Sequence, residues 1–357
     1  MSGAISGLTG GSYGLMQQLI ADSSATYAKL DQLTMQSSTG YVAGTYAGLD
    51  TATTGSAAGA LSIAPQVAAI NNTVSNLNTV AGQMGVQQSA ITTISQIATT
   101  ALSQFQSVSA LTPQSMTTAA STARQALVQI SSLINTKDGQ TYLFGGQNSG
   151  SAPVPNASNI TSSSFYTNIQ SAVANLSING ANTTTSNVMS AAQTNSPFNA
   201  PIGSSTGLPQ VAGAGGAMIT IGIAATANAF VTASGGNTTG GYMGDIMTSL
   251  AAIANLSPSQ IGGAGFAAFA ANTIGTMTNA LNSMALDAGV LGNNQALLAT
   301  QATNLQQTST ALSTQLANFD QVNMTSTLAN LSATQTQLQA SYQLIAAMKT
   351  MSLTQYI

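Results

Sequence analysis

The most regular pattern of apolar positions lies in the last part of the chain. Two series recur every seven positions: Leu298, Leu305, Leu312 and Phe319, then, after a step of five, Met324, Leu331, Leu338 and Ile345. Such heptads predict an amphipathic, coiled-coil-like helix with one interruption near Asp320. No Gly or Pro follows Gly292, so residues 293–357 contain neither helix breaker. About 60 residues of continuous helix would extend for about 90 Å, which is a rod rather than part of a globule.

Stripes with alternating steps of four and three predict further helices nearer the N-terminus. The first comprises Met16, Ile20, Ser23, Tyr27 and Leu30, and it stops at residues 37–40, Ser-Ser-Thr-Gly. A second stripe runs over residues 70–105 and breaks at Thr112-Pro113, and a third covers residues 116–134. The Gly/Thr/Ala-rich residues 40–60 are predicted to be an irregular connector.

The centre of the chain has a different composition. Residues 141–144 (TYLF), 217–221 (AMITI) and 230–231 (FV) are predicted to be strands. The Ser/Thr/Asn/Gly/Pro-rich stretch from 150 to about 240 is either a small β-rich domain or partly disordered. A Gly-interrupted helical pattern returns over residues 244–291.

Charged residues make up only 3% of the 357 residues, with 4 Lys+Arg, 7 Asp+Glu, no His and no Cys. This inventory lacks an imidazole base, a thiolate nucleophile and the common zinc ligands, so we expect no enzyme, no catalytic residues, no cofactor and no metal site. Asp22 and Asp31 have no base partner, and the glycine-rich residues 262–265 lack the Lys-Ser/Thr of a phosphate-binding loop. Four cations also make nucleic acid an unsuitable partner.

The surface opposite the apolar stripes is uncharged as well. Residues 293–357 carry only Asp320 and Lys349, and their other polar residues are Gln, Ser, Thr and Asn. Such side chains lose less than charges do when they leave water, so this helix is suited to burial by copies of itself. A compositional bias of all exported proteins of the source organism is an equally good contributor to this pattern, although it would not create the heptads. We expect neither membrane insertion nor a cleavable signal peptide.

Several short motifs resemble the flagellin superfamily, and within it the hook-associated proteins of the hook–filament junction. They are residues 316–320 (LANFD), 335–343 (QTQLQASYQ), the ending 351–357 (MSLTQYI), residues 37–40 (SSTG) and residues 138–146 (DGQTYLFGG). Together the similar regions cover both ends, about half of the chain. The chain departs from the superfamily after Gly40, where Tyr41-Val42-Ala43-Gly44 replaces a basic and then acidic stretch.

The resemblance implies a mainly α fold: a long antiparallel, coiled-coil helical bundle formed by the N- and C-terminal segments, with an inserted small β-containing domain. Residues 1–40 and 315–357 would be terminal axial helices in an inner coiled-coil layer, and residues 41–61 a connector. Residues 62–140 and 263–314 would form a helical core domain. Residues 141–262 would be a variable, Ser/Thr/Gly-rich outer domain.

The function implied is a structural, self-assembling subunit of the bacterial flagellum at the hook–filament junction, needed for motility. Its partners would be copies of itself, other flagellar axial proteins (hook-associated proteins and flagellin) and an export chaperone. It would be extracellular, exported unfolded by the flagellar export apparatus. A filament flagellin is the first alternative, a secreted surface adhesin a more distant one, and a Ser/Lys hydrolase lacks a sequence context that supports it.

The assembly interface is predicted to consist of apolar residues of the two terminal helices. They are Met16, Ile20, Tyr27, Leu30, Leu316, Phe319, Met324, Leu328, Leu331, Leu338, Tyr342, Ile345, Met348, Leu353 and Tyr356. Their burial among neighbouring molecules would drive assembly at about 25 cal/mol per Å² of apolar surface.

Overall fold

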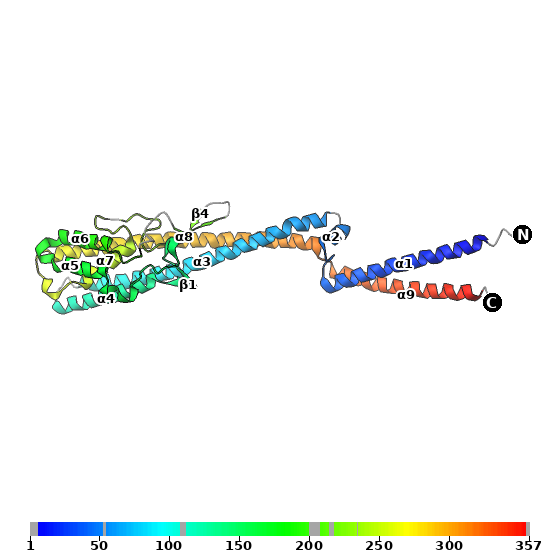
Figure 1. The fold of residues 1–357 in the computed structure, drawn as a ribbon, viewed down its shortest axis with the longest axis horizontal. Coiled ribbons are helices and arrows are strands. Elements are labelled where there is room, and N and C mark those ends of the chain that lie inside the picture. The colour runs from blue at the N-terminus through cyan, green and yellow to red at the C-terminus, as the bar shows by residue number, and fades with distance from the viewer. Residues whose placement is uncertain are drawn as a thin grey trace. The chain divides into compact units, whose positions relative to one another are not determined.

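The computed structural model describes residues 6–52, 55–107, 112–199, 208–213, 218–233 and 235–354. Long helices that pack against one another dominate it, with two small antiparallel sheets, as the sequence predicted (Figure 1). The helices are α1 (Ser6–Thr39), α2 (Tyr46–Ala52), α3 (Ser56–Ser107), α4 (Pro113–Ile134), α5 (Ser164–Ala174), α6 (Leu176–Thr194), α7 (Tyr242–Ala254), α8 (Phe266–Asp320) and α9 (Met324–Thr354). The strands are β1 (Lys137–Asp138), β2 (Thr141–Tyr142), β3 (Gln210–Ala212) and β4 (Met218–Thr220).

The chain divides into two compact units. Unit 1 comprises residues 1–72 and 305–357, and unit 2 comprises residues 73–304. Unit 1 therefore joins the two ends of the chain, whereas unit 2 is continuous in sequence. The predicted four-part division into terminal helices, connector, core and outer domain stays a prediction.

Local sequence signals set several helix boundaries. Gly40, with φ of 76°, terminates α1 at the predicted Ser-Ser-Thr-Gly stop. The predicted break at Thr112-Pro113 is the start of α4, where Thr112 and Ser115 form a capping box and Pro113 occupies the first turn. The predicted interruption near Asp320 is confirmed, because α8 ends at Asp320 and α9 begins at Met324.

Unit 1 contains an antiparallel helix pair, α1 and α9, which lie side by side (Figure 1). A short antiparallel bridge joins Tyr41 to Gln321 where the two helices meet. The Val42 N–H donates to the Asp320 carbonyl at 2.8 Å, and the Val322 N–H donates to the Gly40 carbonyl at 3.0 Å. We call residues 40–42 and 320–322 the elbow.

Residues 40–60 are more regular than the sequence predicted. They contain α2 and the start of α3, which continues through Pro65. Between the ends of α3 and α8 that belong to unit 1, the Ser309 hydroxyl donates to the Asn71 side-chain oxygen at 2.7 Å. In unit 2, the Gln295 side chain donates to the Ala81 carbonyl at 3.0 Å. These bonds place α3 beside α8 within each unit.

Unit 2 has a core of its own. Every residue of α7 is buried, and α7 packs against α4, α5 and α6. Fully buried side chains around it include Phe144, Phe165 and Phe269, together with Ile, Leu and Met residues of α3 and α4. The Gln87 side chain, 2% exposed, donates to the Leu143 and Ile223 carbonyls and so fixes two loops on α3.

The described residues between 150 and 240 contain more helix than strand, which corrects the β-rich alternative for this stretch. Residues 164–194 form α5 and α6, and the sheet of β3 and β4 pairs only three residues of each strand, Val211 with Ile219 at its middle. Of the predicted 141–144 strand, only Thr141 and Tyr142 are in β2. Ala217, the first residue of the predicted 217–221 strand, lies outside the described residues.

The predicted strand at Phe230–Val231 is wrong, and Asp287 on α8 supplies the physical reason. Its carboxylate accepts the backbone N–H groups of Ala229, Phe230 and Val231 at 2.7, 3.0 and 3.0 Å. A strand would need those donors for its neighbour. The fully buried carboxylate instead binds the loop to the helix.

Replacing this carboxylate should destabilise unit 2. Asp287→Ala leaves three backbone N–H groups without their acceptor, so we expect the free energy of unfolding to fall by about 3 kcal/mol. Chemical denaturation followed by circular dichroism measures this. Asp138→Ala, on the exposed strand β1, is the matched control and should change stability by less than about 0.5 kcal/mol. An equal effect of both variants would contradict the role of Asp287.

The buried carboxyl groups of Asp245 and Asp287 should make the stability of unit 2 depend on pH. Burial raises the pKa of Asp245 and of Asp287, although hydrogen bonds from Thr238, Thr239 and the 229–231 backbone oppose the change. A raised folded-state pKa gives stability that is fully present below the unfolded pKa of about 4 and is lost as pH rises through the folded value. The melting temperature should therefore be higher near pH 4 than near pH 7. Asp287→Asn should flatten that dependence, and a melting temperature that falls on acidification would refute the prediction.

Candidate assembly interface

The contact between α1 and α9 is built from two matched series of inward-facing residues, which we call the seam. Each series advances by steps of four and three, as in a coiled coil, and its members are buried or half-buried. On α1 they are Leu19, Ser23, Thr26, Leu30, Leu33 and Ser37; on α9 they are Thr327, Leu331, Thr334, Leu338, Ser341 and Ile345. Half of these residues carry a hydroxyl rather than an apolar side chain. The pair therefore buries much less apolar surface than a coiled coil with Leu or Ile throughout.

The structure divides the predicted interface residues into groups. Leu30, Leu331, Leu338 and Ile345 are in the seam. Leu316 and Phe319 are half-buried at the end of α8. Five are exposed: Ile20, Tyr27, Met324, Leu328 and Tyr342. The side chains of Met16, Met348 and Leu353 lie outside the described part of the structure, as does the whole of Tyr356.

The α1 stripe predicted from the sequence shares Ser23 and Leu30 with the seam. It also includes Ile20 and Tyr27, whereas the seam has their half-buried neighbours Leu19 and Thr26 and, in addition, Leu33. The signal that could have found the true phase was the pair Leu30 and Leu33, which follows the step of three. Thr26 and Ser37 were not predicted, because hydrophobicity does not identify a hydroxyl that faces another helix.

Four of the exposed side chains lie on one side of the helix pair. Ile20 and Tyr27 on α1, and Leu328 and Tyr342 on α9, each directly follow a seam residue at the equivalent heptad position. In an antiparallel pair these positions face each other across the same edge of the seam. Their exposed fractions are 54, 59, 51 and 53%, so half of each side chain is in contact with solvent. We call these four residues the apolar flank.

The elbow fixes the register of the apolar flank. Ile20 precedes Tyr41 by 21 positions, and Tyr342 follows Gln321 by 21 positions. Because both helices rise equally per residue from the bridge, Ile20 and Tyr342 lie at about the same height. Asp22 and Lys29 directly precede seam residues, so these two charges of α1 lie on the opposite edge, whereas Asp31 directly follows Leu30. The exposed Leu344 of α9 also lies on that opposite edge, since it directly precedes Ile345.

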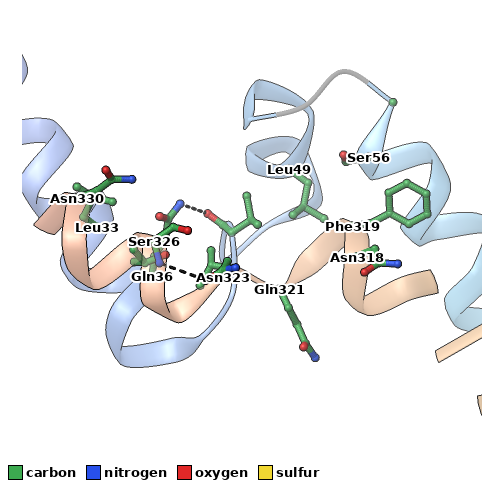
Figure 2. Close-up of a pocket in the computed structure, with 14 residues that line it drawn as sticks. Leu33, Gln36, Leu49, Ser56, Asn318, Phe319, Gln321, Asn323, Ser326 and Asn330 are labelled. Carbon is green, nitrogen blue, oxygen red and sulfur yellow. Dashed lines mark hydrogen bonds between the residues drawn. The ribbon is translucent and has the colours of Figure 1, made fainter. Parts of the chain in front are cut away.

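A pocket of about 560 Å³ opens at the elbow, within unit 1. All five helical segments of the unit contribute to it (Figure 2). It is lined by Leu33, Gln36, Val42, Leu49, Gly55, Ser56, Asn318, Phe319, Gln321, Val322, Asn323, Ser326, Thr327 and Asn330, none of which is charged. The Gln36 amide donates to the Val42 carbonyl at 2.9 Å, and the Asn323 side-chain oxygen accepts the Ser326 N–H at 3.2 Å near the start of α9.

Phe319 is held at this pocket by a glycine. A Cβ added at Gly59 on α3 would lie 2.8 Å from the Phe319 ring, closer than real contacts allow. Because Gly59 has no side chain, the Phe319 ring on α8 can approach the backbone of α3 directly. Phe319 and Leu49 line one part of the pocket, and Leu33 lines another (Figure 2).

Other kinds of site find no support in the described residues. No group of three or more Asp, Glu, His or Cys in that part of the chain is placed to hold a metal ion. Asp22 and Asp31 are both exposed on α1. Gly262 and Gly265, with φ of 74° and 82°, make the turn that precedes α8. Among the same residues, no helix is both long and apolar enough to cross a membrane.

The seam should be sensitive to loss of its few apolar groups. We expect Leu338→Ala to weaken the α1–α9 pairing by about 2–3 kcal/mol, because Leu338 is only 7% exposed. Hydrogen–deuterium exchange of α1 and α9 should accelerate while that of α7 is unchanged. Leu328→Ala, on the same helix but exposed, is the matched control and should leave exchange of the monomer unaltered. Equal acceleration by both variants would show that the seam is misassigned.

Comparison with family models gives a match to the C-terminal part of the chain. Residues 274–357, which include most of α8 and all of α9, match the bacterial flagellin C-terminal helical region. No curated protein matches the chain. The match covers the α9 half of the seam and of the apolar flank. The C-terminal part of this chain is thus similar to that of flagellins, a structural and self-assembling family of the extracellular flagellum, and this similarity supports a flagellar structural subunit of the flagellin superfamily.

Proposed function

We propose that the protein is a self-assembling subunit of the bacterial flagellum that acts at the hook–filament junction, and that the apolar flank of α1 and α9 is buried against neighbouring subunits. One observation carries this proposal: the helix pair buries hydroxyls in its own seam and leaves Ile20, Tyr27, Leu328 and Tyr342 half in water. In an isolated molecule, the exposed halves of these four side chains contribute no free energy of burial. A polymer gains the burial of all four side chains.

The energies involved suit a polymer better than a single dimer contact. Burying the exposed half of a large apolar side chain contributes about 1 kcal/mol. Four such residues supply about 4 kcal/mol, which is at the lower end of the entropy lost on association. A subunit in a helical tube contacts several neighbours, so the same surfaces become stabilising when contacts add along the assembly.

The polar surface of the pair is also inexpensive to dehydrate. Residues 321–348 contain no charged residue. Several hydroxyls already donate to the carbonyl four residues earlier in their own helix, including Thr26 to Asp22, Thr336 to Ser332 and Ser341 to Gln337. Such internally bonded hydroxyls lose little when water is removed. The helices can therefore be surrounded by other helices without the penalty that buried charges impose.

The junction position rests on the resemblance of residues 351–357 and 335–343 to hook-associated proteins. The family match itself fits a filament flagellin equally well. In the junction assignment, the partners are the hook-associated proteins, flagellin and copies of this chain, and the subunit reaches the cell exterior through the flagellar export apparatus with the help of a chaperone. These partners and this route are part of the proposal.

The apolar flank can be tested without disturbing the monomer. The double variant Ile20→Ser, Leu328→Ser should keep the helical content and the hydrogen exchange of the wild-type monomer, because both side chains are exposed. It should raise the protein concentration needed for assembly at least tenfold, as judged by sedimentation and electron microscopy. Gln337→Ser, an exposed residue of α9 beside the seam residue Leu338, is the control and should assemble normally. Undiminished assembly of the double variant would refute the use of this surface.

The same assay separates the two flagellar roles. A junction subunit should add to purified hook preparations as a short, limited segment and should make no long filaments with itself. A filament flagellin should grow into long filaments. Long filaments of the purified chain would replace the junction assignment with that of a filament subunit, and failure to assemble under both conditions would contradict the structural role itself.

A further inference from the structure

The elbow pocket has the chemistry of a receptor for an uncharged side chain that is part apolar and part polar. Its interior includes Leu33 and Leu49, which are 7% and 3% exposed, and the ring of Phe319. Asn318 and Asn330 are exposed at its edge, and the side-chain amide of neither is hydrogen-bonded to another residue that the structure describes. The apolar interior favours a hydrophobic group, and the free amides can bond a hydroxyl.

A tyrosine fits both requirements, since its ring is apolar and its single hydroxyl donates and accepts. The tyrosines of this chain are distributed unevenly. In unit 2, Tyr166 and Tyr242 are 5% and 1% exposed, whereas in unit 1 Tyr41 and Tyr46 are each 48% exposed and Tyr27 and Tyr342 are more than half exposed. Exposed tyrosines are typical anchors of protein interfaces, because a large rigid surface is buried at a small entropy cost.

We propose that the elbow pocket receives Tyr342 from a second copy of this chain, an inference that rests on the proposed self-assembly. Tyr342 is preferred to Tyr27 because of charge. No charged residue lies between positions 321 and 348, whereas Lys29 and Asp31 lie two and four positions after Tyr27. Entry into an uncharged pocket would remove water from those charges at a considerable cost. Tyr342 brings only amide, hydroxyl and apolar neighbours with it.

The pocket cannot be filled by Tyr342 of the same molecule. Tyr342 lies 21 positions beyond Gln321 along α9, a helical distance of about 30 Å from the elbow. The contact therefore needs a second copy displaced along the helix axis by about 20–30 Å. Donor and pocket are different surfaces, so each copy can offer one and receive the other. Such a heterologous contact repeats along a line of subunits and does not close on itself as a dimer.

Disulfide trapping tests this contact directly, because the natural chain has no cysteine. One preparation carries Tyr342→Cys and another carries Asn330→Cys, at the edge of the pocket. Mixed, assembled and mildly oxidised, the two should give a covalent heterodimer as the main product, since a disulfide requires Cα atoms within about 7 Å. The pair Tyr27→Cys with Asn330→Cys is the matched control and should give at least tenfold less. Equal yields, or no heterodimer in intact assemblies, would overturn the proposal.

A double-mutant cycle supplies the energetic test. Tyr342→Ala should raise the concentration needed for assembly about tenfold, and Tyr342→Phe about twofold. Asn330→Trp, which fills the pocket from an exposed position, should have an effect similar to that of Tyr342→Ala. Tyr342→Ala and Asn330→Trp together should raise the concentration needed for assembly no more than either substitution alone, because they remove the same contact. When Tyr27→Ala is combined with Asn330→Trp, their separate increases in the concentration needed for assembly should instead multiply, because the two substitutions remove different contacts.

Different outcomes contradict the proposed self-assembly and the proposed pocket contact. If the wild-type protein does not assemble, the proposed function is wrong and the pocket has no second copy to receive. If the wild type assembles while Tyr342→Ala and Asn330→Trp have independent effects, only the pocket contact is wrong. Circular dichroism of each variant monomer must match that of the wild type, and a variant that loses helix is replaced by Tyr342→Ser or Asn330→Phe.

Discussion

The shortage of apolar side chains between α1 and α9 is the constraint on which the rest of unit 1 depends. Each helix contributes three hydroxyl residues to its six seam positions, so the pair cannot gain the free energy of an ordinary coiled coil. The apolar residues that could have filled the seam, such as Ile20 and Leu328, are displaced by one position onto the flank. The sequence thus holds the helices together weakly and reserves apolar surface for contacts outside the molecule.

Unit 2 shows the opposite arrangement. Its central helix α7 is buried along its whole length, and the buried Asp287 carboxylate accepts three loop N–H groups, although the buried Thr248 and Ser249 hydroxyls of α7 have no hydrogen-bond partner among the described residues. Asp245 accepts the Thr238 and Thr239 hydroxyls in the same way. Buried carboxylates with complete hydrogen bonding specify one loop conformation. Unit 2 therefore has the internal contacts of a self-sufficient fold, which unit 1 lacks.

Periodicity predicted the long helices and the break after Asp320, because steps of seven and of four and three are properties of helices whatever they pack against. In α1 it selected Ile20 and Tyr27 rather than Leu19 and Thr26, since the most apolar residues were assumed to face the partner helix. Thr26 and Ser37 face α9 instead, and no hydrophobic pattern marks a hydroxyl. The elbow pocket was equally invisible, because Leu49 and Phe319 are 270 positions apart and meet only in the folded chain. Phe230 and Val231 were predicted to be a strand from their apolar side chains, and the sequence gives no sign that the Asp287 carboxylate accepts their backbone N–H groups.

Chain connectivity explains why a weak seam is compatible with ordered ends. Closing a flexible loop between α1 and α9, which are separated by about 280 residues, would cost on the order of 5 kcal/mol in entropy, more than a half-hydroxyl seam readily supplies. Unit 2 contains both residue 73 and residue 304, so most of that loop is already closed once unit 2 has folded. A folded unit 2 would therefore lower the entropy cost of pairing α1 with α9. Under the proposed function, the pair is stabilised further by the neighbouring subunits that cover the apolar flank, which would link the order of the chain ends to association.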